Sequence, residues 1–145
     1  MPPPCPLCAS EVLPIVWQNR MCRVVWVQDP EYPGYLRVIW QRHVEEMTDL
    51  SWAEANHLWR ILWGVERALR AEAQPDKVNL AAFGNVVPHL HWHVIPRYRD
   101  DPHFPEPYWG RRVRNRPSVR AVATCETMRA ALTAELGRGE DVALV

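Results

Sequence analysis

The 145-residue sequence has no excess of either charge, a single lysine and no long apolar run. Lys+Arg and Asp+Glu both total 17, so no overall positive charge draws the chain toward nucleic acid polymers or anionic membranes. Any phosphate that the protein binds must therefore be held by local donors. We accordingly expect neither a nucleic acid nor a membrane as its partner.

We also expect no targeting or membrane-spanning segment. No segment approaches the roughly 20 apolar residues of a membrane span, and the Pro-rich start of the chain has neither the basic region nor the apolar stretch of a signal peptide. At this length a core can form without disulfide staples, so the four cysteines are expected to be reduced thiols or metal ligands. We expect a soluble, cytoplasmic protein with one domain over residues 1–145.

Three of the six histidines stand at alternate positions in the segment HLHWHVIPR, residues 89–97. Alternation with period two is typical of a β-strand, so His89, His91 and His93 are predicted to share one face at steps of roughly 6.6 Å. Their apolar neighbours would pack on the other face. Such a concentration argues against an accidental surface cluster, but the spacing alone leaves catalysis and metal chelation open, because alternating histidines can bind zinc.

The remaining pattern predicts an α+β fold in which a long helix packs on an antiparallel sheet. Strands are expected over 21–28, 35–41, 77–83 and 87–95, with the first two forming a hairpin. Ser51 and Glu54 form a capping box that opens the long helix, which ends at Gln74-Pro75. Its predicted buried stripe is Ala55, Leu58, Leu62, Val65 and Leu69. The loop 100–117 has no assignable element, and 118–137 is expected to be a C-terminal helix supported by Val119, Val122, Met128 and Leu132.

The sequences that flank the histidines resemble those of the histidine-triad family of nucleotide hydrolases and transferases. A glycine and an amide lie just upstream within 79–88, and Pro96-Arg97 closes the segment. Residues 33–39, followed by His43 and 49–50, resemble the family's second strand, and residues 5–8 resemble its optional metal half-site. The similarity covers about residues 5–105, and the chain is identified as a bacterial member that resembles diadenosine polyphosphate hydrolases.

This resemblance implies a covalent mechanism. A neutral imidazole can attack phosphorus to give a nucleotidyl-histidine that water later cleaves, and donors on both sides favour the middle histidine. The family assigns the same position, so His91 is the expected nucleophile. The resemblance further implies that the carbonyl of His89 accepts the other ring N–H of His91, and that His93 hydrogen-bonds a phosphate or leaving-group oxygen. The implied substrate is a dinucleoside polyphosphate or related nucleotidyl conjugate, cleaved at the α-phosphate.

Four further residues are candidate substrate contacts. Asn85 occupies the family's usual glutamine position, beside Gly84, which lets the backbone approach a ligand. Asn79 lies where relatives carry a polar ligand contact, although either asparagine could instead cap a turn. Asp29, or its neighbour Gln28, is the candidate for holding the ribose.

Val86 and Arg97 are also considered as possible substrate contacts. Val86 stands where the phosphoramidate-cleaving branch has serine or threonine, and a valine cannot donate to a leaving nitrogen. Phosphate leaving groups are therefore expected to be favoured over amines. Arg97 is expected to be a solvated surface residue rather than a phosphate ligand.

The pair Cys5-x-x-Cys8 is ambiguous by itself, because it could bind a metal, be redox-active or be idle. The resemblance implies that His43 and His89 complete a closed structural zinc site, which the chemistry does not require. A disulfide and unoccupied thiols remain the alternatives. Cys22 and Cys125 are expected to be ordinary core or helix-face residues.

Three rival functions remain open at this stage. The chain could bind nucleotides as a regulator with little turnover, hydrolyse nucleoside phosphoramidates, or hold a catalytic metal on the three histidines. The family also implies a homodimer whose interface includes the long helix. Trp59 and Trp63, which lie off the predicted stripe, fit such an interface or a core whose stripe was misplaced.

Overall fold

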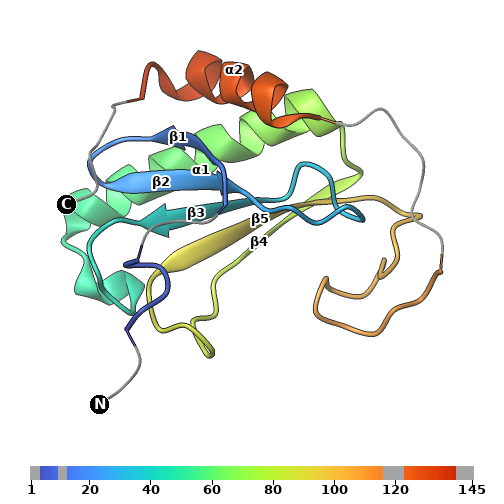
Figure 1. Cartoon of the computed structure of the whole chain (residues 1–145), viewed down its shortest axis with the longest axis horizontal. Coiled ribbons are helices and arrows are strands. Elements are labelled where there is room, and N and C mark those ends of the chain that lie inside the picture. The colour runs from blue at the N-terminus through green and yellow to red at the C-terminus, as the bar shows by residue number, and fades with distance from the viewer. Residues whose placement is uncertain (1–3, 10–12, 116–122, 140–145) are drawn as a thin grey trace.

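The computed structural model describes residues 4–9, 13–115 and 123–139. Five antiparallel strands form one sheet in the order β1-β2-β3-β5-β4, and both α-helices lie together on one side of it (Figure 1). The elements are β1 (Ile15–Gln18), β2 (Cys22–Trp26), β3 (Leu36–Trp40), the 3₁₀ helix η1 (Met47–Asp49), α1 (Trp52–Ala73), β4 (Lys77–Ala81), β5 (His91–Arg97) and α2 (Cys125–Leu136). The expected α+β class is confirmed.

The hairpin of β2 and β3 forms as the sequence predicts, with Val25 opposite Arg37. Its connection turns at Gly34, whose φ of +96° lies in the region that favours glycine. The short strand β1 was not predicted. It has only four residues and pairs with β2 through an irregular register between Ile15 and Trp17, so it shows no clean alternation.

The long helix α1 begins and ends where its sequence signals place it. Ser51 and Glu54 form the expected capping box, and Gln74 adopts a left-handed conformation at the C-cap. The predicted stripe is buried except for Ala55, which is half-buried, and Ile61 and Ala68 widen it. Because α1 packs on both the sheet and α2, its buried surface is broader than a single stripe.

The second helix α2 is capped by Thr124 and packs across α1. The two helices approach closely at Gly64, where any side chain would collide with Leu136. Met128 and Leu132 are buried as predicted. The part of the expected helix over 118–122, with Val119 and Val122, lies outside the described residues.

The sheet separates core from site by the alternation of its side chains. Leu36, Val38 and Val94 face the helices and belong to the main hydrophobic core. Arg37 is paired in register with His93, so both lie on the opposite, open face. Among the described residues no helix is both long enough and apolar enough to cross a membrane. Trp59 and Trp63 are exposed, which excludes a core position for them; the oligomeric state stays a prediction.

Candidate functional site

Only two of the three alternating histidines lie on a strand. The expected strand over 87–95 is β5, which begins at His91 and runs to Arg97. Pro88 has no backbone N–H that could join a ladder. The ring Nε2–H of His89 donates to the carbonyl oxygen of Trp40 at 2.6 Å, and a longer β3–β5 ladder would need this oxygen as an acceptor. His89 therefore lies in the preceding loop, fully buried, and the prediction of a three-histidine strand was wrong at this position.

The hydrogen bond expected for His91 is present. Its Nδ1–H donates to the carbonyl oxygen of His89 over 2.6 Å, which leaves the lone pair on Nε2. Burial lowers the pKa of His91, the charge of Arg37 lowers it further, and the bond to His89 opposes both. The imidazole is therefore neutral near pH 7, with one nitrogen held and the other available to a ligand.

His93 is buried beside Tyr35, whose hydroxyl lies 2.6 Å from His93 Nδ1. Burial, aided by the charge of Arg37, lowers the pKa of His93 to about 3. Burial likewise raises the pKa of Tyr35 to about 12. Both groups are therefore neutral at physiological pH. When the tyrosine hydroxyl donates to Nδ1, the ring hydrogen lies on Nε2, and His93 is then a hydrogen-bond donor toward the site.

Sequence reasoning missed Arg37 as a site residue. It lies on β3 directly opposite His93, and it is half-buried with its Nε atom lacking a hydrogen-bond partner within the described part of the chain. Its charge acts on Tyr35, His91 and His93. Alternation along β3 does place Arg37 on the open face, but only the pairing of β3 with β5 shows that it lies opposite His93.

An aromatic wall, formed by Phe83 and Trp109, borders His93 on the open face. The ring centroid of Trp109 lies 4.8 Å from that of His93, and Phe83 packs edge-to-face on Trp109 at 4.8 Å. Phe83 and Trp109 remain 59% and 49% exposed. Trp109 comes from the loop that follows β5, for which the sequence predicted no regular element.

That loop is anchored by a buried ion pair at the end of β5. Arg97 donates from Nε to Asp101 Oδ2 at 2.8 Å, and its other nitrogens donate to Asn79 Oδ1 and the carbonyl of Glu106. Burial raises the pKa of Asp101, but hydrogen bonds from Arg97 and three backbone N–H groups outweigh it and hold the pKa at about 2. Arg97 is 2% exposed, so the expectation of a solvated arginine was wrong.

Of the candidate residues in the loop before β5, one lines a pocket beside His91 and two do not. Gly84 has a φ of +76° and lines a pocket of about 450 Å³ together with His91. Asn85 is exposed, and Val86 is 93% exposed; neither lines this pocket. The substrate argument based on Val86 therefore has no support from the geometry. A larger hollow of about 910 Å³, between α1 and the end of α2, contains none of the residues 89–93.

The other two predicted substrate contacts, Asn79 and Asp29, form hydrogen bonds within the protein. Asn79 accepts from Arg97, as described above, and Asp29 accepts a hydrogen bond from the hydroxyl of Tyr108 at 2.8 Å. Tyr108 in turn packs against Tyr35 and Trp109. Both residues thus support the loop that carries the aromatic wall, and their role as direct ligand contacts stays a prediction.

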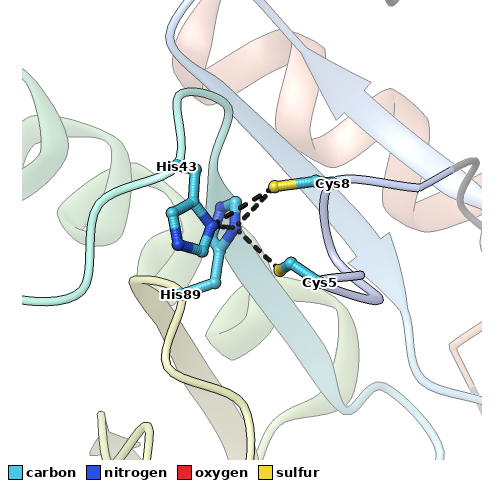
Figure 2. Close-up of side chains that lie close together, drawn as sticks. All are labelled: Cys5, Cys8, His43 and His89. Atoms are coloured by element: carbon cyan, nitrogen blue, oxygen red, sulfur yellow. Dashed lines mark hydrogen bonds between the residues drawn. The ribbon is translucent and has the colours of Figure 1, made fainter. Parts of the chain in front are cut away.

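Cys5, Cys8, His43 and His89 converge on one point, as Figure 2 shows. Their ligand atoms all lie within 4.8 Å of one another. The Nδ1 atom of His89 lies 3.4 Å from Cys5 Sγ, 3.5 Å from Cys8 Sγ and 3.2 Å from His43 Nδ1. The four residues proposed from the resemblance are therefore brought together, although they come from three separate parts of the chain.

The donor set and its geometry fit zinc. Tetrahedral zinc with ordinary Zn–S and Zn–N bonds separates its ligand atoms by about 3.3 to 3.8 Å, close to the distances within the cluster. Because the Nε2–H of His89 donates to the carbonyl of Trp40, the lone pair of that ring lies on Nδ1, the atom turned toward the cysteines. The cysteines are free rather than disulfide-bonded.

Comparison with known proteins identifies the family of the chain. The family described as "HIT domain" matches residues 14–100, more than half of the sequence. The chain belongs to the HIT domain family. A solved histidine triad protein from Bradyrhizobium japonicum is 26% identical, with a TM-score of 0.70 over 88% of this chain and 97% of that one. A second, from Marinobacter aquaeolei, is 28% identical with a TM-score of 0.64, and covers 86% and 85%.

Two curated relatives of this HIT-family chain carry the names of enzymes. An AP-4-A phosphorylase from Mycobacterium tuberculosis is 29% identical over 96 residues, which are 62% of this chain and 49% of the relative. A bis(5'-adenosyl)-triphosphatase from Saccharomyces cerevisiae is 32% identical over 76 residues, which are 48% and 37% of the two chains. The matches thus span half or less of each relative's length.

Proposed function

We propose that this HIT-family protein is an enzyme that cleaves dinucleoside polyphosphates, or related nucleotidyl conjugates, at the α-phosphate. The observation that carries the proposal is the hydrogen bond between His91 Nδ1–H and the carbonyl of His89. It fixes the ring with the nucleophilic lone pair on Nε2, in an imidazole that is neutral because of burial.

The reaction has two displacement steps. In the first, Nε2 of His91 forms a bond to the α-phosphorus, and the bond to the bridging oxygen breaks as its electron pair leaves with the remaining phosphate chain. In the second, water attacks the same phosphorus, the P–N bond breaks with its pair returning to Nε2, and a nucleoside monophosphate is released with loss of a proton. His93, as a neutral donor, stabilises the charge on the phosphoryl oxygens.

The relatives support this substrate class by their names, which refer to AP-4-A and to bis(5'-adenosyl) triphosphate. Because the matches cover half or less of those proteins, the activity is a proposal for this chain. The presence of both a held nucleophile and a neighbouring neutral donor favours turnover over nucleotide binding alone. A catalytic metal on the histidines is disfavoured, because His89 is turned into the cysteine cluster and away from a shared site with His91 and His93.

We also propose that Cys5, Cys8, His43 and His89 hold a structural zinc ion. Such an ion cross-links the N-terminal segment to the loops that precede η1 and β5, and supplies stability rather than chemistry. His91 is not among the ligands, but the carbonyl that orients it belongs to one of them.

A substrate panel tests the proposed reaction. Dinucleoside tri- and tetraphosphates and a nucleoside phosphoramidate are incubated with the wild type, and the products are separated by chromatography. We expect a nucleoside monophosphate plus the remaining nucleotide, and a loss of turnover on the order of 10³- to 10⁶-fold in His91→Ala. His57→Ala on α1, which removes a histidine remote from the site, is the control. Turnover in His91→Ala within tenfold of the wild type would exclude the mechanism.

A further inference from the structure

The open face of the sheet carries three arginines in strand positions, and the structure uses them differently. Arg23 donates to Gln41 and to the carbonyl of Leu7, and it is buried. Arg97 donates hydrogen bonds to Asp101, to Asn79 and to the carbonyl of Glu106 in the loop after β5. Both guanidinium groups therefore serve the fold.

Arg37 is different. Its side chain is half-buried and hydrogen-bonds Tyr35, but its Nε has no hydrogen-bond partner in the described chain, and it belongs to no ion pair formed by those residues. A guanidinium that is partly removed from water without a counter-charge is costly for the folded protein. Such a group is suited to receive an anion, and its planar fork matches phosphate oxygens.

The register of the sheet says where that anion lies. Arg37 is opposite His93, whereas the residue opposite His91 is Ile39. Arg37 therefore stands one same-face step, roughly 6.6 Å, along the strands from the nucleophile. Arg37 is therefore placed to hold a phosphate that is linked to the attacked one and lies on the side of His93.

We propose that Arg37 is a specificity-determining residue that binds the phosphate adjacent to the one attacked, so that the site selects ligands with two or more linked phosphates. This inference rests on the proposed function and deepens it. It also supplies the reason for a preference that the exposed Val86 cannot supply. Because the protein has no net charge, the linked phosphates depend on this local cation.

Binding measurements separate this inference from the catalytic proposal. Calorimetric affinities for AMP, ADP and ATP are compared in the wild type, Arg37→Met, Arg37→Lys and Arg60→Met. Methionine keeps much of the aliphatic length without the charge, and Arg60→Met makes the same change on the exposed side of α1. We expect Arg37→Met to weaken ADP and ATP by roughly tenfold to a hundredfold and AMP by less than threefold. Arg37→Lys should fall between, and Arg60→Met should match the wild type.

Equal weakening of AMP and ADP in Arg37→Met would overturn the inference, because Arg37 would then bind the attacked phosphate itself. Unchanged affinities for all three would overturn it as well. In the turnover assay, Arg37→Met should shift kcat/KM from the dinucleoside polyphosphate toward the phosphoramidate, whereas His91→Ala abolishes both activities. A wild type that turns over nothing but keeps the Arg37-dependent preference for ADP would refute the enzyme and leave the phosphate site standing.

Discussion

At the scale of single residues, the two imidazoles on β5 differ in which nitrogen is held. His91 is held through Nδ1–H by a backbone carbonyl, so its Nε2 has a free lone pair. His93 is held at Nδ1 by the Tyr35 hydroxyl, so its Nε2 can carry the hydrogen. Under the proposed mechanism, the partner of one ring atom thereby gives two neighbouring histidines opposite roles, nucleophile and donor.

Removing the Tyr35 hydroxyl should lower kcat by leaving the His93 ring without the group that orients it. In Tyr35→Phe, His93 loses the partner that orients its ring, and we expect kcat to fall by roughly tenfold to a hundredfold, as for other lost orienting contacts. Tyr98→Phe is the matched control, because it removes a buried hydroxyl bonded to the carbonyl of Ala73, remote from His93. Steady-state kinetics on both variants checks this, and equal kcat losses in the two would contradict it.

The sequence predicted the histidines of the site better than its arginines. His91 and His93 could be recognised because alternation is a local signal. Arg37 and Arg97 could not, because an arginine in a strand is usually solvated, and its burial depends on partners distant in the chain. Arg97 is buried by its contacts with Asp101 and Asn79. Arg37 is recognised as a site residue only because the strand register places it opposite His93.

At the scale of elements, the parts that were predicted correctly are those with local signals. The capping box at Ser51 and the β-branched and aromatic residues of β2 and β3 need no information from elsewhere in the chain. The start of β5 was misplaced because it depends on a long-range contact, the His89 ring on the Trp40 carbonyl. The four-residue β1 is fixed by pairing with β2 rather than by its own pattern.

Metal removal tests the cluster that joins the N-terminal segment to the site. Elemental analysis of protein purified without chelators should find about one zinc per chain. Loss of the ion should lower Tm and raise hydrogen exchange of residues 4–9, because the ion joins this segment to the loops before η1 and β5. Turnover should persist, since His91 is not a ligand. Cys22→Ser changes a buried cysteine outside the cluster and should keep the zinc. Absence of zinc, with Cys5 and Cys8 alkylated in the native state, would refute the site.

At the scale of the whole molecule, one face of the sheet carries the main hydrophobic core and the other carries the candidate site together with the contacts that support it. The helices cover the first face, and the loop after β5 packs on the second through Arg97 and Asp101. That loop brings Trp109 to His93 and Tyr108 to Asp29. The composition of 100–117 indicated a loop, and the order of its described part, 100–115, comes from hydrogen bonds that converge on the buried carboxylate of Asp101.

This carboxylate should make the fold sensitive to acid. The pKa of Asp101 is held at about 2, below its ordinary value of 3.8. The ionised carboxylate therefore contributes stability above about pH 4, and this contribution, about 2 kcal/mol, is lost as the pH falls toward 2. Asp101→Asn should lose it at pH 7 as well, by about 3 kcal/mol or more, because the Arg97 charge stays buried and unpaired.

Urea unfolding at pH 7, 4, 3 and 2 measures both effects. Glu31→Gln is the control, since its ion pair with Arg112 is partly exposed and should be worth less than about 1 kcal/mol. The wild type should lose stability between pH 4 and 2 more steeply than Asp101→Asn. Parallel acid profiles for the two proteins would show that Asp101 is not the responsible group.

The central claim is a covalent bond between His91 Nε2 and the α-phosphorus, and trapping it is the most direct test. The enzyme is mixed with a dinucleoside polyphosphate labelled at the α-phosphate, quenched in alkali within the first turnover, and digested. We expect acid-labile label on the peptide that contains residues 89–97, approaching one equivalent per active site if hydrolysis of the intermediate is slow, and none in His91→Ala. Equal label in the wild type and His91→Ala, or product formed during the first turnover without any labelled protein, would contradict the mechanism.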